Sequence, residues 1–226
     1  MKKLMLLAIS FLMVLNSFSQ QDEKGGRHIN DQSNGNLLYI YQYTDIQGSP
    51  FLYDDWIDGA IVLNQSQLNH VKLKFDTYSN KFVINKNDTS YEISKAINEV
   101  RFFPNNDTSN ARIYRKGFNI NMRLNPNVYM QVMAEGKLTL LKYTYKDLEE
   151  YNEYGSATKY KRFRDGQQYF ILKDGQYIST TLTKKNLQDA LNDKWAAVSD
   201  FLNKKGLNGK DEKSWIAAFR FYNSLN

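Results

Sequence analysis

The sequence predicts a mainly β protein of the α+β class: an antiparallel meander, curled into a barrel-like or sandwich sheet, with a C-terminal two-helix hairpin. Three observations lead to this prediction. Apolar and polar residues alternate through much of residues 37–182, as in half-buried strands. Turn-forming pairs, rather than helix-length segments, separate these runs, so the strands are expected to pair antiparallel. After Thr183 the spacing of apolar residues becomes helical.

The N-terminus has the pattern of a signal peptide over residues 1–19. Lys2 and Lys3 precede an apolar run from Leu4 to Leu15, and small residues at 17 and 19 predict cleavage after Ser19. A buried N-terminal helix or an anchor is the alternative. Residues 20–36 are polar and aperiodic, which predicts a flexible leader. We therefore expect an exported protein, periplasmic, at the cell surface or secreted, with no transmembrane segment after cleavage.

Residues 37–182 are expected to form one antiparallel β domain. The Asp174-Gly175 pair lies between two aromatic-rich runs and predicts a two-residue hairpin turn. The predicted strands are Leu38–Thr44, Gly59–Leu63, Val71–Phe75, Phe82–Ile84, Glu99–Phe103, Val128–Ala134, Leu138–Tyr145, Tyr160–Arg164, Tyr169–Lys173 and Gln176–Thr181.

Residues 183–226 are expected to form a helical hairpin packed on the same domain. One helix is predicted from the apolar stripe Leu187, Leu191, Trp195, Val198 and Leu202. Its N-cap is Thr183, and Gly206 is expected to end it. A second helix is predicted over residues 212–222, with Asp211 as its N-cap.

The composition excludes several kinds of chemistry. The chain has no cysteine, which excludes disulfides, thiolate metal sites and a cysteine nucleophile. The phosphate-binding, dinucleotide, zinc-protease and serine-hydrolase motifs are missing from the sequence. No cofactor is therefore expected. Loss of Lys2 and Lys3 lowers the net charge from +6 to +4. Because the protein is expected to be exported, nucleic acid is not an expected partner.

Few residues remain as candidates for catalysis. His28 lies in the predicted leader and His70 directly precedes a predicted strand, where a turn or edge role is expected. Acidic residues cluster around Trp56 and around Tyr151. Two carboxylates held at the right separation can hydrolyse a glycosidic bond. Solvated loop acids are the alternative. The members of the two clusters are Asp54, Asp55 and Asp58, and Glu149, Glu150 and Glu153.

A basic, tyrosine-rich segment from Lys142 to Tyr169 is the candidate binding site. Tyrosine rings beside cations can stack on sugars and hold phosphate or carboxylate groups. The candidate ligand- or partner-binding residues are Lys159, Lys161, Arg162, Tyr151, Tyr154 and Tyr160. An ordinary solvent-facing strand surface is the alternative, because tyrosine and lysine are common there.

Five segments of the chain resemble a family of exported, signal-peptide-bearing proteins of unknown function common in the Bacteroidota. They are GSPFLYDDWIDGAIVL at Gly48–Leu63, VKLKFDTYSNKFVI at Val71–Ile84, YGSAT at Tyr154–Thr158, YFILKDGQYI at Tyr169–Ile178 and FYNSL at Phe221–Leu225. The resemblance implies a secreted, β-rich protein and no established activity or catalytic residues.

Together these observations predict an exported cell-envelope protein, non-enzymatic, with a binding or accessory role. Its expected partner is an envelope component, which is a protein, a glycan or an anionic lipid. A carboxylate-dependent glycan-active enzyme and a structural subunit of an envelope assembly are the two alternatives.

Overall fold

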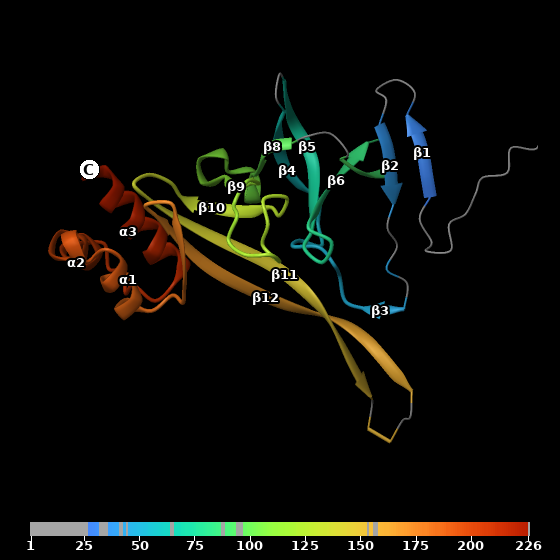
Figure 1. Ribbon diagram of the computed structural model, residues 1–226. Coiled ribbons are helices and arrows are strands. Elements are labelled where there is room, and N and C mark those ends of the chain that lie inside the picture. Colours follow the sequence, from blue (N-terminus) through green and yellow to red (C-terminus); the bar gives the residue numbers. More distant parts are fainter. Residues whose placement is uncertain are drawn as a thin grey trace, which may run out of the picture.

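The computed structural model describes residues 27–31, 36–40, 43, 45–63, 66–86, 89–93, 97–152, 154–155 and 158–225. It confirms the mainly β class (Figure 1). The strands are β1 (Arg27–Asp31), β2 (Asn36–Ile40), β3 (Ile46–Gln47), β4 (Ile57–Leu63), β5 (Gln67–Asp76), β6 (Lys81–Lys86), β7 (Thr89–Glu92), β8 (Ile97–Phe102), β9 (Arg112–Arg115), β10 (Met130–Ala134), β11 (Leu138–Asn152), β12 (Lys159–Lys173) and β13 (Gln176–Thr180). The helices are α1 (Lys184–Ala190), α2 (Trp195–Lys204) and α3 (Glu212–Ser224).

One large sheet organises the molecule. Its strands follow the order β13-β12-β11-β10-β9-β8-β4-β5-β6-β7, and β3 pairs in parallel with β12 outside this order. The remaining pairs are antiparallel, and most join strands that are consecutive in the chain. The sheet is not closed into a barrel, so the barrel-like form is wrong: β13 and β7 end the order without pairing with each other. Helices, rather than sheet closure, bury the apolar face of β10–β12.

The C-terminal region holds three helices instead of the two that were predicted. Thr183 caps α1 as expected, since its hydroxyl accepts a hydrogen bond from the Asn186 backbone. The predicted first helix is broken after Leu191 by a 3-10 turn over residues 192–194, and α2 begins at Trp195. Asn192 and Asp193 stand at this break, and their short polar side chains favour turns over helix interiors. Helices α2 and α3 form the C-terminal pair.

Helix α3 is fixed to the sheet at both ends. At its start, Glu212 accepts hydrogen bonds from Lys142 Nζ at 2.6 Å and from the Tyr169 hydroxyl at 2.7 Å. At its end, the Asn223 amide bonds both the N–H and the C=O of Leu138. The Trp215 side chain between these ends is fully buried, and its Nε1 donates to Gly209 O. The helices therefore share a core with the sheet.

Three apolar clusters form the core. The first lies between the helices and β10–β12, and includes Leu140 and Trp215. The second is rich in aromatic rings, with Phe75, Phe82 and Tyr129 packed within 6.5 Å of one another by their centroids. The third contains Leu141. Because neighbouring strand residues point to opposite faces, Leu140 and Leu141 place the first and third clusters on opposite sides of the sheet.

The structure describes only part of the N-terminal region for which a signal peptide and a leader were predicted. Residues 1–19 lie outside the described residues, so the signal peptide stays a prediction. Inside the predicted leader, residues 27–31 form β1, which pairs with β2 as a separate two-stranded sheet. In the part of the chain that the structure describes, no helix combines the length and the apolar character needed to cross a membrane.

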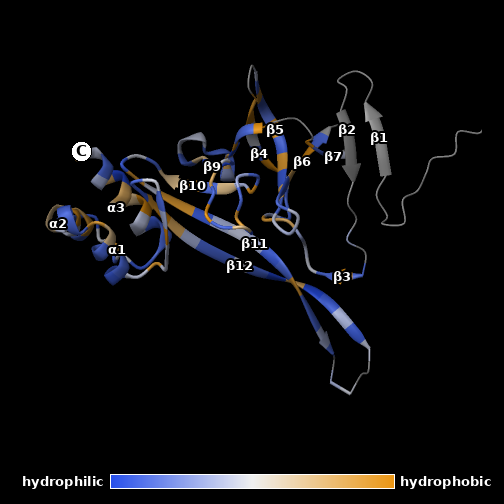
Figure 2. Ribbon diagram, in the orientation of Figure 1, coloured by the Kyte–Doolittle hydropathy of each residue, from blue (hydrophilic) through white to orange (hydrophobic). Residues whose placement is uncertain are grey.

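The longest feature of the fold is a hairpin arm. Strands β11 and β12 each contain 15 residues and pair along their whole length. Beside β11, the pairing with β10 stops at Lys142, and beside β12 the pairing with β13 begins at Tyr169. Residues 146–165, here called the arm, therefore extend beyond the main run of strands, with only the two-residue strand β3 paired beside them (Figure 1). Figure 2 shows that the arm is mostly hydrophilic, whereas the base of both strands near the helices is more apolar.

Candidate functional site

The arm brings together the six residues that the sequence singles out for binding. Tyr151 lies on β11, and Lys159, Tyr160, Lys161 and Arg162 lie on β12. The sixth residue, Tyr154, is in the turn between the two strands and is fully exposed. The site is therefore built from the outer ends of two paired strands and their turn.

The register divides these side chains between the two faces of the arm. Tyr151 is opposite Tyr160, and Glu149 is opposite Arg162, so these four side chains share one face. The Tyr151 and Tyr160 ring centroids are 5.7 Å apart, and the Arg162 guanidinium lies 4.9 Å from the Tyr151 centroid. This face is a row of aromatic rings with one stacked cation.

Four of the five cations of the arm form ion pairs across the strands: Lys146, Lys159, Lys161 and Arg162. Arg162 Nε is 2.8 Å from Glu149 Oε2, and this hydrogen bond lowers the pKa of Glu149. On the other face, Glu150 lies 3.5 Å from Lys159 Nζ and 4.0 Å from Lys161 Nζ. Residues 146–165 contain five basic and five acidic residues. The arm thus has no net charge, and its basic residues do not produce the positive surface that the sequence suggested.

The arm is supported on one side by the segment around β3, which pairs with Lys161 and Arg162. The Tyr151 hydroxyl donates a hydrogen bond to Gln47 Oε1 at 2.7 Å. Phe163 packs edge-on against Tyr43 and Tyr78, with centroids 5.5 and 5.4 Å away. Outside these contacts, the rings of Tyr154 and Tyr160 remain exposed, Tyr160 by 39%. They are the exposed aromatic rings of the predicted site, and Lys159, Lys161 and Arg162 beside them are exposed as well.

The acidic clusters do not form a pair of facing carboxylates. Glu149 and Glu150 are neighbours on one strand and point to opposite faces of the arm. Asp54 and Asp55 are exposed, and Asp58 forms an ion pair with Lys72 at 2.8 Å. Within the described ranges, no group of three or more acidic or histidine side chains is arranged to hold a metal ion. Glu153 lies outside the described residues.

His70 lies in an irregularity of the sheet. It is exposed on β5, where the pairing with β4 shifts between Gly59 and Ile61, and its φ is +54°. A bulge explains this backbone, because one strand carries extra residues there. The sequence predicted a turn or strand-edge role for His70 just before a strand. In the structure His70 lies within β5, at the bulge.

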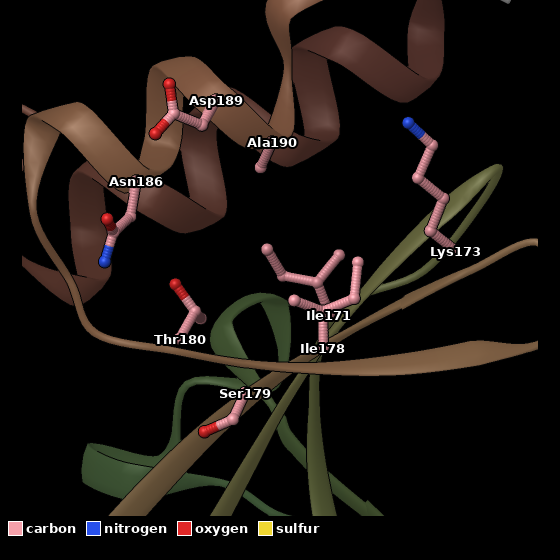
Figure 3. A pocket seen from close by; sticks show the side chains of 8 residues that line it. All are labelled: Ile171, Lys173, Ile178, Ser179, Thr180, Asn186, Asp189 and Ala190. Carbon is pink, nitrogen blue, oxygen red and sulfur yellow. The ribbon is translucent and has the colours of Figure 1, made fainter.

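A pocket between α1 and the edge strand β13 was not predicted. It has a volume of about 330 Å³. Ile171 and Ile178 form an apolar floor, and Ala190 of α1 faces them (Figure 3). Asp189 and Lys173 lie at the polar rim. No motif marks this pocket, because its lining comes from one helix and two strands and depends on how they pack.

Comparisons with protein-family models, with curated proteins and with solved structures find no match to this chain.

Proposed function

We propose that this chain is an exported, non-enzymatic accessory protein of the cell envelope that binds a partner protein through the tip of the arm. The observation that carries the proposal is the arm itself, formed by the outer parts of two 15-residue strands and ending in a turn with the exposed ring of Tyr154. Export rests on the signal-peptide pattern of residues 1–19 and on the resemblance to exported proteins.

The charge of the arm favours a protein over an anionic lipid as the partner. Binding to an anionic membrane surface needs unpaired cations, and each additional one strengthens it. Here Lys159, Lys161 and Arg162 each have a carboxylate partner. Tyrosine and arginine, in contrast, are enriched among the residues that carry binding energy in protein interfaces.

The backbone of the arm offers a second means of recognition. Past Lys142, the outer edge of β11 pairs with no strand among the described residues, although the Lys146 N–H donates to Thr77 O at 3.4 Å. Unpaired N–H and C=O groups along a strand edge can accept an added strand from another chain. A partner can therefore combine backbone hydrogen bonds with contacts to the tyrosine rings.

The test compares an arm variant with a matched surface variant. Tyr154→Ala with Tyr160→Ala removes the two exposed rings, while Met122→Ala with Leu68→Ala removes two exposed apolar side chains elsewhere. Association of the purified mature proteins with envelope fractions is measured at two salt concentrations. We expect about tenfold weaker association for the arm variant only, with little effect of salt.

Two results would count against this function. Equal association of both variants would exclude the arm tip as the binding surface. Association that survives protease treatment of the envelope would identify a glycan or lipid as the partner, and strong weakening by salt would favour an anionic one. Circular dichroism spectra and melting temperatures of both variants serve as the folding control.

A further inference from the structure

A second and larger pocket lies away from the arm. Its volume is about 540 Å³, and it is an open pocket lined by the β5–β6 turn, the end of β9 and the segment that leads into β10. Phe82 and Tyr129 belong to its apolar wall, and Lys116, Asn125 and Asn127 to its polar wall. A volume of this size is in the range of small-molecule sites.

Hydrogen bonds hold the walls of this pocket in place. Asn80 bridges to the segment before β10, because its Oδ1 accepts from Tyr129 N at 2.7 Å and its Nδ2 donates to Tyr129 O at 3.2 Å. The Gly117 N–H donates to Pro126 O at 2.9 Å, which links the end of β9 to the same segment. The pocket is therefore preformed, so the free-energy cost of ordering its walls on ligand binding is small.

Lys116 is the cation of the pocket that has no carboxylate partner. Its Nζ lies 4.2 Å from the Tyr129 ring centroid, and no acidic side chain among the described residues is within ion-pair distance. The acid of the pocket, Glu92, is paired with Lys81 at 3.0 Å. Lys116 is exposed as a whole, but partial burial lowers its pKa, and the charge of Glu92 opposes this only in part. An anion placed beside Lys116 would remove this cost.

Two amides in the lining add hydrogen-bonding groups to the same pocket. The Nδ2 atoms of Asn125 and Asn127 donate to no described residue, whereas Asn125 Oδ1 accepts from the Asn127 backbone at 2.9 Å. Carboxamides can donate to and accept from hydroxyl groups. One ammonium group also matches a single negative charge better than it matches a dianion, for which further cations would be needed.

We propose that this pocket binds a small hydroxylated carboxylate of the sugar-acid class, with the carboxylate on Lys116 and the hydroxyls on Asn125 and Asn127. The proposal is independent of the arm, because it concerns a different surface and a small molecule. It adds a ligand-binding site to a protein whose proposed function is the binding of a partner protein.

The test uses D-glucuronate as the probe and D-glucose as its uncharged counterpart. Binding to the full mature chain is measured by calorimetry or by nuclear magnetic resonance titration. Lys116→Met keeps the alkyl chain over Tyr129 and removes the charge, and Lys205→Met changes an exposed lysine on another element. We expect glucuronate to bind the wild type and Lys205→Met alike, and to bind Lys116→Met about tenfold more weakly or not at all. Glucose should bind the wild type at least about tenfold more weakly than glucuronate.

Three results would overturn the proposal: no binding of glucuronate to the wild type, equal binding to Lys116→Met, or equal binding of glucose. A second measurement avoids dependence on the variant. Glucuronate should shift the backbone amide resonances of Lys116, Asn125 and Asn127 in the wild type, and shifts confined to other regions would also overturn it.

Discussion

Glu99 shows how a single buried charge is stabilised in this sheet. Its side chain is 9% exposed and contacts the guanidinium groups of Arg101 and Arg115, with the Arg115 Nε at 2.6 Å. Burial alone would raise the pKa of Glu99, but the hydrogen bonds from Arg115 and Arg101 outweigh it and lower that pKa. Arg115 also binds Glu135, whose side chain is 59% exposed.

We expect Glu99→Gln to lower the free energy of unfolding at pH 7 by about 1–3 kcal/mol, because charge-assisted hydrogen bonds are lost in a buried site. A carboxyl whose folded pKa is lowered stabilises the fold above its unfolded pKa of about 4.3, and this contribution disappears as the pH falls through the folded pKa. The difference between wild type and variant should therefore shrink at acid pH. Urea unfolding at pH 7 and at acid pH measures this difference in the free energy of unfolding. Glu135→Gln is the control at an exposed carboxylate, and it should change the free energy of unfolding by less than about 1 kcal/mol.

Gly59 and Gly166 differ in what a side chain would meet. A Cβ at Gly59 would lie 2.3 Å from the Arg101 carbonyl oxygen, which is backbone and cannot move without distorting the sheet. A Cβ at Gly166 would lie 2.3 Å from the Tyr145 ring, which is the end of a side chain that can turn. We expect Gly59→Ala to lower the free energy of unfolding by about 1–3 kcal/mol, and Gly166→Ala to lower it by less. Thermal unfolding of the two variants gives the order, and the reverse order would contradict the expectation.

At the scale of elements, local patterns predict hairpins well and long strands poorly. The Asp174-Gly175 pair predicts the turn between β12 and β13, and the structure has it there. Two predicted strands, Tyr160–Arg164 and Tyr169–Lys173, are parts of the one strand β12. The interval between them begins with Asp165 and Gly166, and both residue types are depleted in strands. Pairing with residues 143–146 of β11 keeps this interval extended, and that pairing partner is not visible in the local sequence.

The two tryptophans of the helical region should differ in their effect on stability. The sequence places Trp195 on the buried stripe, but the helix break leaves it partly exposed at the start of α2. Trp215 is instead fully buried against the sheet. We expect Trp215→Ala to cost about 3–5 kcal/mol and Trp195→Ala clearly less. Denaturant midpoints of the two variants decide this, and equal midpoints would mean that the helices do not share the core of the sheet.

At the scale of the whole molecule, strand order is the part that the sequence does not predict. Strands β7 and β9 contain only four residues each, and in β9 two arginines flank Ile113 and Tyr114 without an alternating pattern, so no prediction covered them. The pairing of β8 with β4 across the chain, and the open ends at β13 and β7, depend on contacts between distant segments. For the candidate site, the six residues named from the sequence do lie together in the arm, and their role in binding stays a prediction. The ion pairs that neutralise the arm follow from the register of β11 and β12, which the sequence does not show.

The arm and the base of the same hairpin should differ in local stability. The base of β11 and β12 is covered on both faces by apolar clusters, whereas the arm is a two-stranded ribbon supported mainly around Phe163. Amide hydrogens in residues 147–152 and 159–164 should therefore exchange at least about tenfold faster than those in residues 139–143 and 169–172. Hydrogen-exchange mass spectrometry at neutral pH measures both sets in one experiment.

Phe163→Ala should speed exchange in the arm and leave the base unchanged, because it removes the ring that packs on Tyr43 and Tyr78. Equal protection of arm and base would mean that the hairpin opens as one unit with the sheet. A loosely held arm that becomes protected when a partner binds is what recognition through the tip requires.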